Sequence, residues 1–438
     1  MRAVDKNNQS RRAVLEALAP PNGGPNIKAE AREEAGTDSA SARMPVVVID
    51  DVAELATYVP AWEELARTAI EPNAFYEPWM LMPALKHYAE GKTIKFVLIF
   101  AHEPGRRNGR GALCGLFPIE IQKQYHGLYR KLPIKTISLW KHEYSYICTP
   151  LLREGYARET FAAFFDWVDS YDHGCRLLEL RHIPGDGPIH HLLVDIFNET
   201  KRPSIVTDSF TRAVFNRRAD TDSYMRAALS RVRRKEVRRK QKRISEAGAV
   251  EYLRLEAGMD AEAWVDDFLA FESKSWKGQA GCALACDEND RAFFKSVAVE
   301  AFNRDQLMML ALSLNGHTIA YKCNFLAGRG SFAFKIAFDE QYARYSPGVL
   351  LEFENIRLLH ERAGVEWMDS CASPDRMMIN QLWPERRAIQ TVAVATGKGA
   401  GEFFIALIPM LRWISRKVLH RFKASQRGQQ ALSTEKQK

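Results

Sequence analysis

The sequence predicts an α/β protein made of two successive halves with the same order of helices and strands. Short β-type runs alternate with helical patterns along most of the chain, which is typical of α/β domains. A segment of the first half also matches a segment of the second half in register. With 438 residues, 46% of them hydrophobic, the chain is long enough for two or three domains with sizeable cores.

The first half is expected to hold four strands and two helices. The strands are placed at Val46–Ile49, Lys95–Ala101, Ala112–Lys123 and Arg176–Arg181, and the helices at Val52–Ala69 and Ala157–Tyr171. The second half is expected to begin with a long helix at Ser223–Ala247. Its other helices are placed at Ala261–Trp276, Asp290–Asn303 and Leu350–Ala363, and its strands at Val250–Leu255, Leu307–Leu314, Thr318–Leu326, Ser331–Phe338 and Val365–Asp369.

The internal repeat is visible in the residues as well as in the order of elements. The segment His173–Glu179 aligns with Ala363–Asp369, and continuing without a gap places Pro184, Ile189 and Leu192 on Pro374, Ile379 and Leu382. In each half a helix is expected to end at a glycine with positive φ, before a short strand that ends in a carboxylate. These matches predict a duplicated architecture.

Composition divides the chain into four predicted segments. Residues 1–43 lack apolar periodicity and are expected to be a disordered leader. Residues 44–210 and 211–400 are the two folded domains, the second including the basic helix 223–247. Residues 401–438 are expected to form a basic amphipathic segment and a disordered tail.

The seven cysteines indicate free thiols. Their number is odd and none forms a Cys-x-x-Cys pair, which argues against a disulfide framework and against a zinc ribbon. The histidines His182, His190 and His191 have few carboxylates at ligand spacing, so no metal site is expected. The longest apolar run, Phe403–Leu411, is far shorter than the ~20 residues of a membrane helix. Free thiols indicate a reducing compartment, and we expect the cytoplasm.

The turn Ser346-Pro347-Gly348 is a candidate anion site. It follows three predicted strands and precedes an amphipathic helix, whose free N–H groups and dipole favour a phosphate. Gly348 would allow close approach and unusual torsions, Pro347 pre-sets the turn, and Ser346 can cap the helix. The turn can equally be a simple helix start. In the first half Thr149-Pro150-Leu151 occupies the corresponding place without the glycine, which predicts that this half has lost the function.

The stretch from Phe334 to Leu351 resembles the GNAT-type acyltransferase domain of the CelD-like group, which is associated with cellulose biosynthesis. That group is similar to the Fem-type aminoacyl transferases, which have two tandem GNAT-like folds. The resemblance covers about residues 212–396 and extends more weakly back to Val46, through Trp62, Pro78-Trp79 and Phe117-Pro118. It implies two tandem GNAT-like domains with mixed, largely antiparallel sheets flanked by helices.

The resemblance also implies a donor, an acceptor and a binding turn. GNAT enzymes bind the pyrophosphate of CoA in a Gln/Arg-x-x-Gly-x-Gly/Ala turn. In this chain the spacing is one residue longer, and Leu350 stands at the second small position. The implied co-substrate is acetyl-CoA or another acyl-CoA, and the implied acceptor is an amine, in cellulose, exopolysaccharide or envelope synthesis. The expected cofactor-binding residues are Arg344, Ser346, Pro347, Gly348, Val349 and Leu350.

Acyl transfer to an amine needs a base, an acid for the thiolate and donors for the oxyanion. The candidates are Asp339 as base, Tyr345 as acid and Asp369 as the group that binds the amine, with Tyr342, Lys335 and Asp375 nearby. Each has a structural alternative, because a carboxylate can cap a turn and an aromatic side chain can pack. Cys371 is expected to be a small buried residue.

Charge is concentrated in one helix. The net charge is +8, and Arg231–Arg243 alone holds nine Lys or Arg and one Glu. This distribution argues against a uniformly basic DNA-binding protein. The helix is either a solvated connection or a platform for an anion: the 3′-phosphate of CoA, an acidic polysaccharide, or the acceptor stem of a tRNA.

Two further alternatives stay open. The first is Fem-type aminoacyl transfer, which would require binding of tRNA. The second is a non-catalytic accessory role in polysaccharide synthesis. Residues 403–422 join an apolar run to basic residues, which favours either terminal packing or contact with an anionic membrane surface.

Overall fold

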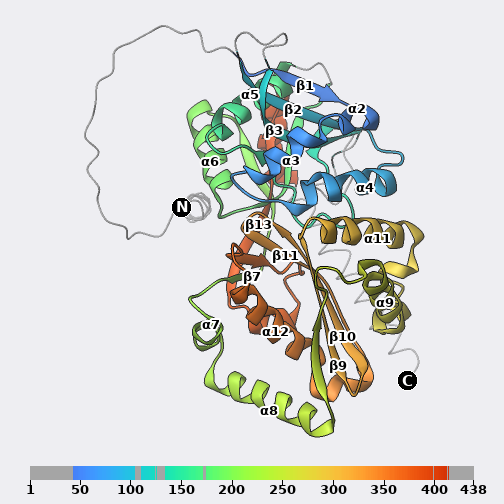
Figure 1. Cartoon of the computed structure of the whole chain (residues 1–438). Helices are drawn as coiled ribbons and strands as arrows, with labels where there is room; N and C mark the ends of the chain where they lie inside the picture. Colours follow the sequence, from blue (N-terminus) through green and yellow to red (C-terminus); the bar gives the residue numbers. More distant parts are fainter. Residues whose placement is uncertain are drawn as a thin grey trace, which may run out of the picture. The chain divides into compact units, whose positions relative to one another are not determined.

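The computed structural model describes residues 43–103, 110–123, 125, 134–170, 174–397, 399–411 and 413. The predicted leader, apart from its last residue, and the tail after residue 413 lie outside these residues. The described residues from 43 onward form one compact unit. Its centre is a 13-stranded sheet with helices on both faces (Figure 1).

The first half contributes seven strands and five α-helices to the described structure. The strands are β1 (Val46–Ile49), β2 (Ile94–His102), β3 (Arg110–Gln122), β4 (Thr136–Leu139), β5 (Leu151–Leu152), β6 (Leu177–Pro184) and β7 (Ser204–Asn216). The α-helices are α2 (Val52–Ala56), α3 (Val59–Arg67), α4 (Pro78–Tyr88), α5 (Ala157–Ser170) and α6 (Pro188–Thr200), and a short 3-10 helix, η1, spans Ala74–Tyr76.

The second half has the same order after a helical connection, α7 (Thr221–Ala228) and α8 (Arg231–Ala247). Its strands are β8 (Val250–Arg254), β9 (Leu307–Leu314), β10 (His317–Ala327), β11 (Gly330–Phe338), β12 (Trp367–Asp369) and β13 (Glu385–Ala395). Its helices are α9 (Ala261–Lys274), α10 (Trp276–Gln279), η2 (Leu284–Cys286), α11 (Glu288–Asn303), η3 (Glu340–Tyr345), α12 (Pro347–Glu361) and α13 (Met377–Leu382).

The strand order confirms the internal repeat and shows how the halves are joined. The order β1-β2-β3-β4-β6-β13-β7-β12-β11-β10-β9-β8 is the same from either end once each first-half strand is matched to its second-half counterpart. In each half the fourth strand and the one after the following helix are parallel, β4 with β6 and β11 with β12. The last strands are exchanged: β13 pairs with β6, and β7 pairs with β12. The two halves therefore complete each other's sheet.

The second-half strands separate two hydrophobic clusters because successive side chains of a strand point to opposite faces. On β9, Met309 and Ala311 face the cluster that includes α9 and α11. Met308, Leu310 and Leu312 face the cluster that includes α12 and the buried side of α8. Figure 1 shows α12 and α9 on opposite sides of these strands. This sandwich holds α12 against the sheet.

Most predicted elements are present, but two predicted helices are interrupted. The region predicted as one helix at 223–247 contains α7 and α8, separated at Leu229 and Ser230. Leu229 is extended, and the Ser230 side chain accepts a hydrogen bond from the Arg233 N–H, which starts a new helix. The region 52–69 is likewise divided into α2 and α3.

The comparison of Thr149-Pro150-Leu151 with the second-half turn was wrong. Leu151 and Leu152 are buried and form β5, which pairs with β3, and the helix α5 begins only at Ala157. The glycine comparison holds, because Gly174 and Gly364 both have positive φ, +63° and +83°. They lie in the loops after the helices rather than immediately at the helix ends.

The predicted boundary between residues 210 and 211 falls inside β7, which crosses from the first half into the second half's sheet. Residues 400–411 are helical. Ile405 and Ile408 of this segment are buried in a small cluster with Leu177 and Ala393, whereas Phe403 and Met410 are exposed. The rest of the predicted segment 403–422, apart from Trp413, lies outside the described residues. No described helix has both the length and the apolar character that crossing a membrane requires.

Candidate active site

A cleft opens where the parallel strands β11 and β12 diverge. The two strands pair only from Gly330 to Phe332, and β11 continues to Phe338 without this partner. Beyond Asp369 the chain turns at Cys371, whose φ is +51°. The resulting cleft has a volume of about 450 Å³. Its size is within the range of small-molecule sites.

The walls of the cleft come from three elements of the second half. One wall is β11 from Ala333 to Phe338, another is α10 with Trp276 and Lys277, and the third is the segment that follows β12. This last segment contributes Ser370, Cys371, Ala372, Asp375, Arg376, Met377, Met378 and Ile379. Lys277 is fixed in place, since its Nζ donates to Glu272 Oε1 at 2.8 Å and to the Ile336 carbonyl at 2.7 Å.

The N-terminal turn of α12 borders this cleft. A Cβ atom added to Gly348 would lie 3.6 Å from Met378 Sδ, 3.6 Å from Phe338 Cδ1 and 3.8 Å from Ile336 Cδ1, and all three residues line the cleft. The N–H groups of Val349 and Leu350 both donate to the Ser346 carbonyl, at 3.0 and 3.2 Å. Pro347 has no N–H, so the remaining donor of this turn is the Gly348 N–H.

Two details of the predicted turn are corrected by the structure. Ser346 occupies the cap position, but its side chain makes no capping hydrogen bond, because its backbone is left-handed with φ of +55° rather than extended. Gly348 has no positive φ, so the unusual torsion of this turn belongs to Ser346. An added Cβ at position 348 would make only ordinary van der Waals contacts, so neither the backbone torsion nor the available space requires glycine, and its absent side chain leaves the cleft lining open at this point. Arg344 is exposed, with its guanidinium 4.7 Å from the centre of the Tyr345 ring.

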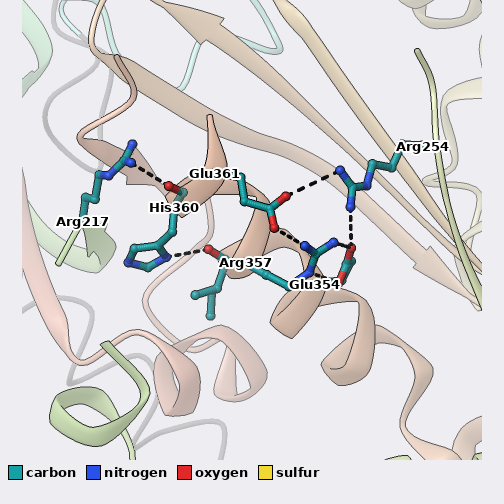
Figure 2. Close-up of polar contacts among 7 residues, drawn as sticks. Arg217, Arg254, Glu354, Arg357, His360 and Glu361 are labelled. Carbon is teal, nitrogen blue, oxygen red and sulfur yellow. Dashed lines mark hydrogen bonds and ion pairs between the residues drawn. The ribbon is translucent and has the colours of Figure 1, made fainter. Parts of the chain in front are cut away.

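The other end of α12 is anchored by arginine side chains (Figure 2). Arg217 donates to four carbonyl oxygens at this end, those of Leu359, His360, Arg362 and Val365, at 2.6–3.2 Å. Arg254 of β8 pairs with Glu354 and Glu361 on the helix surface, and Arg357 bridges the same two carboxylates. A cation at a helix C-terminus also interacts favourably with the helix dipole. These contacts fix the orientation of α12 and hence the position of its N-terminus.

A buried ion pair lies at the base of the cleft. Lys322 of β10 is 2% exposed and Glu352 of α12 is fully buried, with Nζ and Oε2 at 2.8 Å. Glu352 Oε1 accepts from Asn355 Nδ2 at 2.8 Å, and Asn324 Nδ2 donates to Asn355 Oδ1 at 3.0 Å. Both charges line the cleft. A buried pair of this kind must keep both partners, because an unpaired buried charge is costly.

Lys335 is a different kind of cation. It lines the cleft from β11, and its Nζ lies 4.9 Å from the centre of the Tyr144 ring, which comes from the first half. Burial lowers the pKa of Lys335. Within the described part of the chain no carboxylate lies at ion-pair distance from it. Such an amine is available to interact with a ligand in the cleft.

The three predicted catalytic residues lie outside the lining of the cleft. Asp339 caps η3 by accepting from the Gln341 N–H at 2.9 Å. Tyr345 is buried in the cluster beneath α12. Asp369 is fully buried and forms an ion pair with Arg212, whose Nε lies 2.6 Å from Asp369 Oδ1. Arg212 Nη2 donates to Oδ2 at 2.8 Å, and the Cys371 N–H donates to Oδ1. The structure places them around the site but does not bring them together.

Asp375 and Cys371, two other residues considered from the sequence, do line the cleft. Asp375 is exposed, and a hydrogen bond from the Ser373 hydroxyl at 2.6 Å lowers its pKa. Cys371 is buried, and burial raises the pKa of its thiol, which disfavours a nucleophilic thiolate. All seven cysteines are free thiols, as expected. Among the described residues no group of His, Cys, Asp or Glu is arranged to hold a metal ion.

Comparisons with known proteins agree with this architecture. Residues 231–376 match the model of the acetyltransferase (GNAT) domain family. Among solved structures, FemX is similar with a TM-score of 0.51 at 9% identity, covering 76% of this chain and 95% of FemX. The fold is a tandem GNAT fold. The matched range contains α8, α12 and most of the residues that line the cleft, and it points to an acyltransferase.

Weaker similarities extend over a comparable part of the chain. A conserved protein of unknown function from Bacteroides thetaiotaomicron has a TM-score of 0.48 at 9% identity, covering 80% of this chain and 100% of that one. A tandem GNAT protein from the clavulanic acid biosynthesis pathway has a TM-score of 0.40 at 11% identity, covering 81% and 100%. No curated protein matches the sequence.

Proposed function

We propose that the protein transfers an acyl group from an acyl-CoA thioester to an amine, in the cleft between β11 and β12. The observation that supports this most strongly is the divergence of these parallel strands beside the N-terminus of α12. The cleft can hold a chain-like donor arm, and the adjoining turn can hold a phosphate. The GNAT domain match over residues 231–376 is consistent with such a donor.

The residues of the turn fit the pyrophosphate of CoA. Gly348 leaves space beside the cleft and offers its N–H, and Arg344, four residues earlier in the chain, is an exposed cation. Ser346, Pro347, Val349 and Leu350 form the rest of the turn, as the resemblance to GNAT enzymes implies. When bound, the thioester supplies an activated carbonyl carbon that an amine can attack.

We assign the stabilisation of the oxyanion to Lys335. During attack, a C–N bond forms and negative charge develops on the carbonyl oxygen, and the C–S bond then breaks to release the thiolate. A half-buried ammonium without a carboxylate at ion-pair distance among the described residues is suited to stabilise this charge. Protonation of the leaving thiolate by Tyr345 and proton acceptance by Asp339 stay predictions, as does the predicted role of Asp369.

Asp375 is the carboxylate we assign to binding of the acceptor amine. It lies at the exposed margin of the cleft, and its lowered pKa keeps it charged near neutral pH. An ionised carboxylate attracts the ammonium form of an acceptor. A lowered pKa makes the same group a weak base, so the proton must leave by another group. A role in cellulose, exopolysaccharide or envelope synthesis rests on the family resemblance alone.

A second candidate is aminoacyl transfer from tRNA, as in Fem-type enzymes. The similarity to the FemX fold and the exposed cations on α8 favour it. A third, non-catalytic accessory role predicts a folded protein with no affinity for CoA. The cytoplasm and contact with a membrane surface stay predictions as well. Among the described residues, exposed Phe403, Met410 and Trp413 are the groups that such contact would use.

The proposal is tested by release of free thiol from acetyl-CoA in the presence of a panel of primary amines, including amino sugars and nucleotide-linked amino sugars. With a productive amine, Lys335→Met should reduce turnover about 100-fold, because the oxyanion loses its cation. The Kd for acetyl-CoA should change less than about threefold, since the group acts after binding. Lys335→Arg should recover part of the rate.

Lys274→Met is the matched control, because Lys274 is exposed on α9 and lies outside the cleft lining. Full turnover by Lys335→Met would remove Lys335 from the proposal. Failure of all amines to yield an acylated product, together with no binding of acetyl-CoA by the folded protein, would favour the accessory role.

A further inference from the structure

We propose that a second pocket, between α7, α8 and α12, binds the phosphorylated nucleotide part of a substrate. This pocket, called the basic pocket below, has a volume of about 850 Å³ and shares no lining residue with the cleft. Its lining includes Arg226, Arg231, Lys235 and Arg238 together with Tyr252 and Phe353. Only the source of the nucleotide depends on the proposed acyl transfer.

The cations of the basic pocket that have no ion-pair partner among the described residues come from two helices. Arg226 lies on α7, and Arg231, Lys235 and Arg238 follow one another at helical spacing on α8, so that they share one face. All four are exposed, and none has an ion-pair partner among the described residues. By contrast Glu236 neutralises Arg233 and Lys240, which lie outside the pocket lining. The charge that faces the pocket is therefore available to a ligand.

The opposite wall is electrically balanced. Arg357 and Glu354 of α12 line the pocket, but they belong to the network with Arg254 and Glu361 shown in Figure 2. Arg234 also lines the pocket, and its guanidinium donates to the Met225, Arg226 and Leu229 carbonyls at the end of α7. The unpaired positive charge thus lies on the α7–α8 side of the pocket, whereas the α12 side has little unpaired charge.

The α12 side of the pocket presents an apolar and aromatic surface. Phe353 of α12 and Tyr252 of β8 are half-buried and line the pocket with Leu350 and Val237. A planar base or a ribose can pack on this surface while phosphates contact the arginines and Lys235. A simple inorganic anion would use only half of these features. The combination of a cationic wall and an aromatic wall therefore indicates a nucleotide.

The position of the basic pocket fits a substrate that also reaches the cleft. Leu350 lines the basic pocket, whereas the side of Gly348 faces cleft residues, and both belong to the first turn of α12. One source of the nucleotide is the adenosine 3′,5′-bisphosphate end of CoA. The other is a nucleotide carried by the acceptor, such as that of a uridine diphosphate sugar. Both present the same chemistry, namely phosphates beside a base and a ribose.

The test is calorimetric titration of the full chain with adenosine 3′,5′-bisphosphate, uridine diphosphate and inorganic pyrophosphate. We expect one nucleotide to bind at least tenfold more tightly than pyrophosphate, and the preferred nucleotide identifies the source. The double variant Lys235→Ala/Arg238→Ala should weaken this binding about tenfold or more. Arg239→Ala/Arg243→Ala removes the same charge from exposed positions of α8 outside the pocket lining, and it should change the Kd less than twofold.

Phe353→Ala should weaken binding of the nucleotide but not of pyrophosphate, with circular dichroism showing that the fold is kept. Equal losses in the two double variants would show attraction to a basic helix rather than a site, and would overturn the proposal. So would equal binding of nucleotide and pyrophosphate, or binding of a short single-stranded RNA more than 100-fold tighter than either nucleotide. None of these ligands needs the cleft, so binding with no acyl transfer would leave this proposal standing and remove only the proposed function.

Discussion

At the scale of single residues, the ion-pair partner of a charged side chain distinguishes a structural role from a reactive one. Lys322 and Glu352 compensate each other, as do Arg212 and Asp369, whereas Lys335 has an aromatic ring beside it in place of a carboxylate. The predicted Asp369 was recognised as a carboxylate at a strand end, but its arginine partner lies on a strand that was not predicted. Sequence spacing carries no signal for such a pairing.

Gly348 illustrates what the sequence could predict of the site. Proline and glycine after a strand predicted a turn into a helix, and α12 does begin at Pro347, whereas the role of this turn in binding stays a prediction. The pairing of Lys322 with Glu352 could not be predicted, since it joins β10 to α12 through the folded core. The prediction that Gly348 would adopt an unusual torsion was wrong, because the residue of this turn with a positive φ is Ser346.

Glu77 provides a prediction for pH dependence. Its Oε2 accepts from Trp79 Nε1 at 2.7 Å and from Gln306 Nε2 at 2.8 Å, and burial raises its pKa to about 7. Between pH 4.5 and about 7 the folded state holds this proton longer than the unfolded state, so stability falls as the pH rises through this window. Glu77→Gln should be more stable than the wild type at pH 8, by up to about 3 kcal/mol.

The gain from Glu77→Gln should disappear toward pH 5, where the native carboxyl is protonated. Urea denaturation at both pH values measures the difference, and exposed Glu54→Gln serves as control. Burial also raises the pKa of Glu71 to about 7. The stability of the Glu77→Gln variant should therefore still depend on pH in part. An equal effect of Glu77→Gln at both pH values would contradict the assignment.

At the scale of elements, the apolar strands β9, β10 and β11 were predicted closely because each is a continuous run bounded by turn residues. The strands β7 and β13 were not predicted. They carry buried polar and charged residues such as Thr207, Arg212 and Thr391, and each of the two strands pairs with a neighbour on both sides. Local patterns cannot reveal partners that come from the other half of the chain.

The anchoring of α12 predicts that substitutions of two adjacent arginines reduce the free energy of unfolding by different amounts. Arg217→Ala removes four hydrogen bonds to the helix end and should reduce the free energy of unfolding by about 2–3 kcal/mol. Arg218→Ala breaks one exposed pair with Glu385 and should cost less than about 1 kcal/mol. Chemical denaturation of both variants measures this difference, and equal losses would show that the capping contacts contribute little.

At the scale of the whole molecule, the exchange of β7 and β13 makes the two halves mutually dependent. β6 ends the first-half sheet and has β13 as its partner, and β12 has β7. Tyr88 and Tyr144 of the first half also donate to Asp290 of α11 at 2.8 and 2.6 Å. Duplication was predictable from the sequence, but the exchange was not, because it changes no local pattern.

The exchanged strands predict a single cooperative unfolding transition. Differential scanning calorimetry should show one peak with equal calorimetric and van't Hoff enthalpies. Ala393→Asp, which places a charge at a fully buried position of β13 between the halves, should lower the midpoint of the whole transition. Two separable transitions, with only one of them shifted by Ala393→Asp, would show that the halves fold as independent domains.

The measurement that most directly tests the donor cleft is isothermal titration with acetyl-CoA, comparing the wild type with Gly348→Glu. The new side chain would start among Met378, Phe338 and Ile336 and bring a negative charge to the proposed phosphate turn. Ala363→Glu adds the same charge at an exposed position beyond the opposite end of α12 and is the control. We predict micromolar binding by the wild type and the control, with a loss of at least 100-fold in Gly348→Glu. Equal binding by all three folded proteins would contradict a donor site in this cleft.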